Sequence, residues 1–138
     1  MVIQENKVNI MSLPQSEVKR LSKENLTQDD IEYLKDKYGK KFVKALRAVE
    51  ERKIIRYKFK PSESATWIVM GRGRQYFIIP ELYCTCRSFY QEVVISREAT
   101  FCYHLLAQRI AEIREEYESR ESTDTERRKL YVEWRRTD

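Results

Sequence analysis

The cysteines and the histidine constrain this chain more than any other feature of its sequence. Its 138 residues include three Cys and one His, which form two short clusters, Cys84 with Cys86 and Cys102 with His104. Structural zinc is held tetrahedrally by four Cys or His ligands, so these residues make one complete ligand set with none left over. A small domain gains stability when such a site closes its loops. We therefore predict one structural Zn²⁺ ion bound by all four residues.

The spacing inside each cluster predicts its local structure. Side chains two positions apart in an extended segment point the same way, so Cys84 and Cys86 can present both sulfurs to one point. On a helix the same spacing diverges by about 200°. Cys102 is therefore expected just before a helix and His104 in its first turn, with apolar residues at helical spacing continuing as far as Tyr117.

These residues have three alternative interpretations. Cysteines are often plain core residues, but four ligand-type side chains with no spare favour a metal. A catalytic zinc needs an open ligand position and a neighbouring acid or base, and the motif contains neither. A nucleophilic pair of Cys102 and His104 would need residues two apart at a helix start to face each other. We expect a non-catalytic site and no enzyme activity.

Before the zinc ligands, the apolar residues recur first with helical and then with strand spacing, and this pattern predicts the rest of the core. Over residues 14–53 apolar residues recur every three to four positions. A Thr27 cap begins one helix and Gly39 ends it in the left-handed conformation, so a second helix after it completes a hairpin. The period changes to two at Ile54, and turns at Pro61 and Gly71 divide the next segment into a three-stranded antiparallel β-meander.

Together these patterns predict an α+β fold in one compact domain. A short helix is expected between the ligand pairs, a long helix after His104, and a short C-terminal helix after a capping box at Thr123. The predicted parts are a flexible N-terminus (1–13), a helical region (14–53), the meander with the zinc module (54–118) and a C-terminal helical extension (119–138), which opens with a polar break at 120–122.

Composition adds an expectation about location. No apolar run approaches the roughly 20 residues of a membrane helix, and the first residues lack a signal-peptide core. An odd number of cysteines favours thiolate ligands over disulfides. We expect an intracellular protein, cytoplasmic or, if the organism is eukaryotic, nuclear, with no membrane partner.

Basic residues gather in the predicted meander, within a chain of net charge +5. With Tyr57, Trp67 and Tyr76 in the same sheet, they could follow a phosphate backbone and stack bases. They could equally form the solvated face of a sheet whose aromatic residues are core, and the sequence leaves both interpretations open. The candidate nucleic-acid-binding residues are Arg56, Lys58, Lys60, Arg72 and Arg74.

The C-terminal helix carries an apolar stripe of Leu130, Tyr131 and Trp134. A helix this short is marginal alone in water, so the stripe must pack on another surface. Docking on the core of the same chain is one interpretation. Because aromatic residues beside arginines are common interface anchors, the three residues are also candidates for binding a partner protein.

The ligand pattern resembles the SWIM zinc finger, a CxC…CxH module. Phe89, three residues after the second cysteine, and Ala107, three after the histidine, also match that pattern. The likeness extends over residues 27–113 to the small SWIM subunits of Shu-type complexes, through a helical pattern like Leu34, Tyr38, Gly39, Ala45, Leu46, Val49 and Ile54. Arg87 departs from it, because a proline is frequent at that position in the relatives.

This resemblance implies a function. It points to a non-catalytic accessory protein of homologous recombination and DNA repair that binds a RecA-like ATPase, a recombinase paralogue. Single-stranded or branched DNA is a further candidate ligand, and a homo-oligomer is compatible with the pattern. The alternative is a stand-alone SWIM zinc-finger regulator that binds DNA in transposition or transcription.

Overall fold

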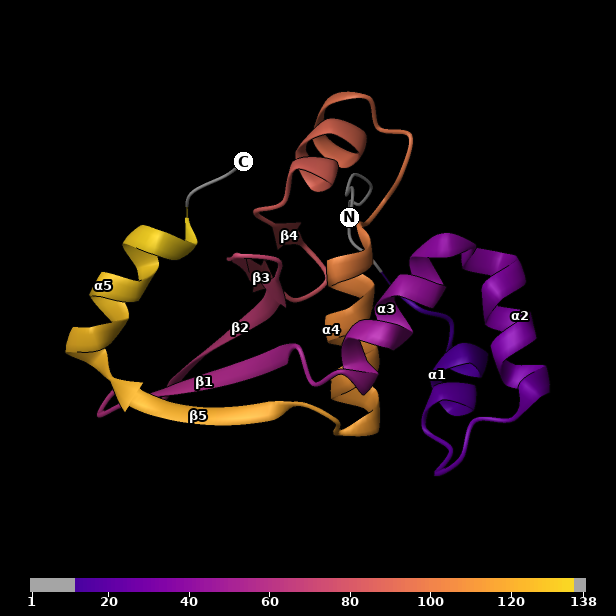
Figure 1. Cartoon of the computed structure of the whole chain (residues 1–138), viewed down its shortest axis with the longest axis horizontal. Coiled ribbons are helices and arrows are strands. Elements are labelled where there is room, and N and C mark those ends of the chain that lie inside the picture. The colour runs from indigo at the N-terminus through magenta and orange to yellow at the C-terminus, as the bar shows by residue number, and fades with distance from the viewer. Residues whose placement is uncertain (1–11, 136–138) are drawn as a thin grey trace, which may run out of the picture.

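The computed structural model describes residues 12–135 and has the predicted α+β class (Figure 1). Its elements in chain order are α1 (Gln15–Leu21), α2 (Gln28–Tyr38), α3 (Lys40–Glu50), β1 (Ile54–Lys60), β2 (Ser64–Gly71), β3 (Arg74–Ile79), β4 (Tyr83–Cys84), the π-helix η2 (Phe89–Ile95), α4 (Tyr103–Arg114), β5 (Glu118–Thr123) and α5 (Asp124–Trp134). Most of the predicted flexible N-terminus lies outside the described residues.

The predicted helical hairpin is formed by α2 and α3, and α1 joins it. The Thr27 hydroxyl accepts a hydrogen bond from the Asp30 backbone N–H at 3.1 Å, and the Asp30 carboxylate accepts one from the Thr27 N–H at 3.1 Å, which is the predicted capping box. The same buried carboxylate pairs with Arg20 of α1 at 2.9 Å and with Lys23 at 3.1 Å. Asp30 thus caps α2 and ties α1 to it.

Gly39 separates α2 from α3 with φ +66° and ψ −143°. The positive φ was expected, but this ψ lies outside the left-handed helical region, in a part of backbone space that only glycine occupies cheaply. The chain therefore turns sharply and starts α3 at once. The apolar face of α3, including Phe42, Ala45 and Val49, is buried against α4.

The sheet has five strands in the order β4-β3-β2-β1-β5. Strands β1 to β3 form the predicted meander, with Ile55 opposite Ile68 and Ile68 opposite Phe77. These three side chains face α5, whereas Ile54 and Val69 face α4 because side chains alternate between the two faces. In Figure 1 α5 lies at one side of the sheet and α1 to α4 at the other. Both faces of the central strands are therefore covered.

The outer strand β5 corrects the sequence prediction. The polar break expected at residues 120–122 lies within β5, which pairs in parallel with β1. Most of its side chains are exposed, so it has no apolar alternation from which a strand could be predicted. Its backbone hydrogen bonds place it at the edge, where charged side chains also discourage pairing with another chain.

Helix α4 crosses the sheet and forms the centre of the larger core. It ends at Arg114, where Glu115 has φ +56°, and so it is shorter than the helix predicted to reach Tyr117. The Tyr117 ring instead meets the Trp67 ring, with centroids 4.9 Å apart. Ala107 is completely buried in α4, which agrees with the expected need for a small residue one turn after the histidine.

Candidate metal centre

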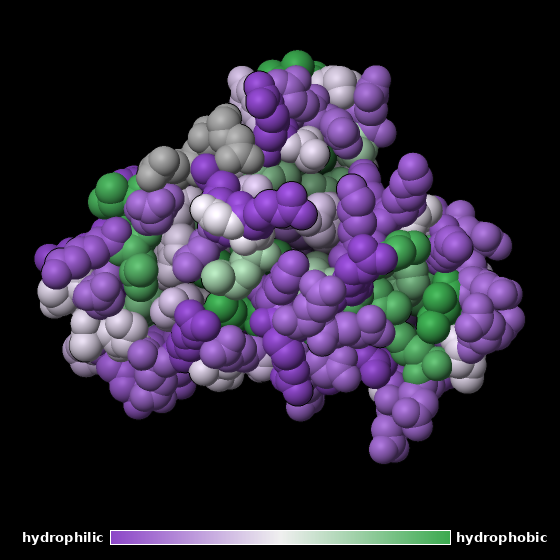
Figure 2. Space-filling view, viewed as in Figure 1, coloured by the Kyte–Doolittle hydropathy of each residue, from purple (hydrophilic) through white to green (hydrophobic). Residues whose placement is uncertain are grey.

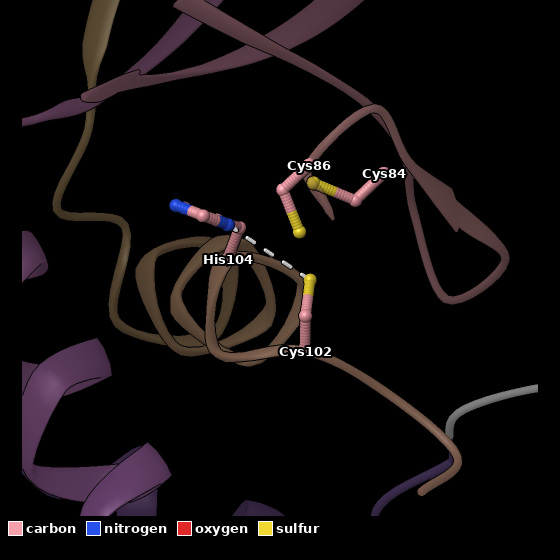
Figure 3. Close-up of side chains that lie close together, drawn as sticks. All are labelled: Cys84, Cys86, Cys102 and His104. Carbon is pink, nitrogen blue, oxygen red and sulfur yellow. Dashed lines mark hydrogen bonds between the residues drawn. The ribbon is translucent and has the colours of Figure 1, made fainter. Parts of the chain in front are cut away.

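Two parts of the chain bring the four predicted ligands together. Cys84 ends β4 and Cys86 follows two residues later at a bend just before the next helical segment, while Cys102 is the N-cap of α4 and His104 lies in its first turn. This is the arrangement that the spacings predict. Figure 3 shows the four side chains converging from the β4 segment and from the start of α4.

The ligand atoms form a compact cluster. The three sulfurs and the ring nitrogen all lie within 4.8 Å of one another, and all four side chains are buried. Cys102 Sγ and His104 Nδ1 are 4.0 Å apart. Ligands around tetrahedral zinc, with Zn–S near 2.3 Å, are separated by about 3.5–3.8 Å. A small inward shift therefore brings the cluster to zinc geometry.

Backbone hydrogen bonds fix the first ligand pair. The Thr85 N–H donates to Phe77 O at 3.2 Å, and the Thr85 hydroxyl accepts from the Phe77 N–H at 3.1 Å. Thr85 thereby extends the pairing with β3, in which Cys84 lies opposite Ile78, and fixes the segment that carries both cysteines. Sequence reasoning missed this role, although the position of a β-branched hydroxyl residue between two ligands was a usable signal.

The sulfur of Cys86 is the best stabilised of the three. It accepts a hydrogen bond from the Phe89 N–H at 3.2 Å, and hydrogen bonds from the Cys102 and Cys84 thiols lower the pKa of Cys86. Burial raises the pKa of Cys84 and of Cys102. Because zinc binds the thiolate form, metal binding at this site must displace thiol protons.

The donor set fits one structural zinc ion. Three thiolates and one imidazole are ligands that zinc prefers, and they fill its four tetrahedral positions. Among residues 12–135 no carboxylate or further histidine joins the cluster. Bound zinc would join the end of β4 to the start of α4 and close the loop that contains η2.

Three of the five predicted nucleic-acid-binding residues contact other side chains of the chain. Lys58 pairs with Glu63 at 2.9 Å and Lys60 approaches Glu121 of β5 at 3.9 Å. The guanidinium of Arg74 lies over the Tyr76 ring, 5.4 Å from its centroid. Because β5 was not predicted, the carboxylate that it brings beside β1 was missed as well.

Arg72 lies instead beside cations from other parts of the chain. It lines a pocket next to His104 together with residues of α3 and the segment after Cys86. The aromatic residues expected to stack bases are also separated, since Trp67 is buried on the α4 face and Tyr57 packs on Trp134 on the opposite face. The predicted aromatic and basic face is therefore not present as one surface.

The apolar stripe of α5 packs on the chain itself. Trp134 is fully buried with Ile55, Phe59 and Ile68, and Leu130 and Tyr131 pack against the same cluster. The indole N–H of Trp134 also donates to the Gln75 side chain at 2.7 Å. The stripe therefore covers the outer face of the sheet, as in the self-docking interpretation, and partner binding by these three residues stays a prediction.

Comparison with known proteins agrees with the geometry of the site. The chain is 32% identical over 71 residues to the zinc finger SWIM domain-containing protein 7 homolog of Dictyostelium discoideum. It is similar to a SWIM zinc finger protein. The match covers 50% of this chain and 46% of the relative, so the chain aligns with about half the length of that protein.

The Cys84, Cys86, Cys102 and His104 cluster and this match together confirm the resemblance predicted from the sequence. No protein-family model matches the chain, and no solved structure matches it. Residues 12–135 contain no helix with both the length and the apolar character needed to span a bilayer.

Proposed function

We propose that this chain is a non-catalytic accessory protein of homologous recombination and DNA repair, which binds a RecA-like recombinase paralogue and contacts DNA. The observation that carries the proposal is the closed Cys3His cluster, buried and complete, in a chain similar to a SWIM zinc finger protein. The site supports a role in holding binding surfaces together, and the recombination role follows from the family resemblance.

The geometry favours binding over catalysis. A catalytic zinc keeps one position for water or substrate and places an acid or base beside it. Here the four protein ligands fill the tetrahedral set, and Tyr76 packs on the His104 ring with centroids 4.3 Å apart. Bound zinc would supply a crosslink, and the chain's own surfaces would make the contacts with partners.

The partner surface has to be sought away from the α5 stripe. Exposed large apolar side chains of the described residues occur on η2 and on the loop before the zinc ligands, where Leu82, Tyr90, Val94 and Ile95 are each at least 43% exposed. Figure 1 shows η2 projecting from the rest of the fold. These side chains are the first to substitute in a partner-binding experiment.

Affinity purification of the native complex tests the proposal. We expect a stable, stoichiometric partner that mass spectrometry identifies as a RecA-like ATPase, retained in moderate salt and lost after zinc chelation. Exposed Lys129 is a suitable site for the affinity label, since it makes no ion pair among the described residues. Recovery of the chain alone, with tight sequence-selective binding to duplex DNA, would instead support a stand-alone DNA-binding regulator.

A further inference from the structure

A basic pocket lies directly beside the metal cluster. It has a volume of about 600 Å³ and is bounded by α3 and the residues that follow it as far as Lys53, by the end of β2 and the turn into β3, by residues 86–88 and by the start of α4. Strongly hydrophilic residues cover much of the middle of the face in Figure 2. The pocket exists only in the folded chain, because its walls come from four separate segments.

The pocket has an excess of positive charge. Its cationic lining residues are Lys44, Arg47, Lys53, Arg72 and Arg87. The single carboxylate in its wall belongs to Glu51, which pairs with Lys53 at 3.2 Å. Within residues 12–135 no carboxylate forms an ion pair with Arg47, Arg72 or Arg87. Three guanidinium groups are therefore available to an anion, and Arg is well suited to phosphate because of its planar set of donors.

The histidine ligand connects this pocket to the metal site. In Figure 3 His104 Nδ1 is directed toward the sulfurs, and the other ring nitrogen points away from all three. A neutral imidazole that binds metal through one nitrogen carries its proton on the other. Since His104 lines the pocket, coordination through Nδ1 would leave an N–H donor there, beside the arginines.

Tyr103 adds an aromatic surface to the pocket wall. Its ring is partly exposed, lies next to His104, and has the Lys44 ammonium 5.6 Å from its centroid. Aromatic rings beside cations are the usual means of holding the bases and the backbone of a single strand together. A pocket of this volume can accept the nucleotides of a flexible single strand. A stiff duplex would contact only the rim of the pocket.

We propose that this pocket binds the phosphodiester backbone of single-stranded nucleic acid, with Arg47, Arg72 and Arg87 as phosphate contacts. The inference rests on the DNA-binding part of the proposed function and gives it a site. It also replaces the basic strip on β1 as the expected contact, because Arg56 and Lys58 do not line the pocket and Lys58 is already paired.

The test is fluorescence anisotropy of a labelled single-stranded oligonucleotide titrated with the zinc-loaded chain. We expect the double variant R47E/R72E to weaken binding by about tenfold or more, as the loss of charge-assisted hydrogen bonds requires. The slope of log Kobs against the logarithm of the salt concentration should become shallower by roughly 1.4, because each of the two lost phosphate contacts contributes about 0.7 on a single strand. The double variant must keep one zinc per chain and the wild-type circular dichroism spectrum.

Two charge-matched variants serve as controls. R128E/K129E reverses two exposed cations on α5, away from the pocket, and R56E/K58E reverses two on β1. Wild-type affinity in R47E/R72E, an equal loss in R128E/K129E, or a larger loss in R56E/K58E would each overturn the proposal. The conservative variant R47K/R72K keeps both positive charges. Oligonucleotide affinity equal to that of the wild type in this variant would support a charge contact at this pocket.

The same variants separate this inference from the proposed function. If R47E/R72E loses oligonucleotide binding but still copurifies with the ATPase partner, both stand. If no ATPase is recovered with the wild-type chain while the pocket variant alone loses binding, the recombination role fails and the pocket assignment remains. If the ATPase is recovered and R47E/R72E binds as wild type, the pocket assignment alone fails.

Discussion

Truncating Trp134 to Ala tests the docking of α5 on the sheet. The indole is 0% exposed, its centroid lies 5.1 Å from that of Tyr57 and 6.3 Å from that of Phe59, and its N–H donates to Gln75 at 2.7 Å. It is the largest fully buried side chain of the described residues. Its removal leaves a cavity between α5 and the sheet and an unpaired amide oxygen on Gln75.

The magnitude follows from these contacts. Truncation of a buried Trp to Ala costs about 3–5 kcal/mol, of which about 1 kcal/mol belongs to the hydrogen bond. With about 2.1 cal/mol/K of unfolding entropy per residue, the 138-residue chain has about 290 cal/mol/K, so the melting temperature should fall by about 10–17 °C. Trp134→Phe, which keeps a ring but removes the donor, should lie between Ala and wild type.

Urea denaturation of the zinc-loaded chain, followed by circular dichroism, measures the effect. Val132→Ala is the matched control, because Val132 belongs to the same helix and is 64% exposed, so its truncation should change stability by less than about 0.5 kcal/mol. Zinc content should remain at one ion per chain in every variant. A Trp134→Ala chain as stable as the Val132→Ala chain would refute the docked position of α5 and return the stripe to a partner.

Three further predictions concern other parts of the fold. Cys86→Ser should abolish stoichiometric zinc binding and largely unfold residues 80–117, seen as lost near-UV dichroism and amide protection, whereas Ser88→Ala should not; a metal-free chain with unchanged melting would contradict this. Hydrogen bonds from the Thr27 backbone and then from side chains hold the pKa of Asp30 below its usual 3.8, so its stabilising contribution is present above that pH and lost as pH falls further. The stability difference between wild type and Asp30→Asn should therefore shrink below about pH 4, and a constant difference down to pH 3 would exclude this role for the carboxylate. Gly39→Ala should cost about 1–3 kcal/mol in thermal melts, because alanine is strained at φ +66° even though space is free around it, and an unchanged melting temperature would mean that the turn relaxes.

The features that could be predicted from sequence depend on short separations along the chain. The convergence of Cys84 and Cys86, two positions apart, and the helix-start pair of Cys102 and His104 follow from the geometry of strands and helices. The Thr27 capping box and the positive φ of Gly39 are also local. In each case the residues that interact lie within a few positions, so the backbone period alone determines how they meet.

The features that were missed depend on contacts between distant segments. Strand β5 carries no apolar alternation, and its pairing with β1 exists because the chain returns past α4 to the sheet edge. Its presence places Glu121 near Lys60, so a carboxylate lies beside one of the basic residues that the sequence suggests as a patch. The sequence of β5 has no periodic pattern from which its pairing with β1 could be predicted.

The sequence alone determined that the chain has one complete zinc ligand set and where each ligand would lie, since ligand identity and local backbone geometry are written in residue type and spacing. Tertiary structure decided which surfaces that site holds in place. It buried the α5 stripe on the sheet and gathered Arg47, Arg72 and Arg87 beside His104. Burial and charge are properties of neighbours in space, and those neighbours are chosen by packing of the whole chain.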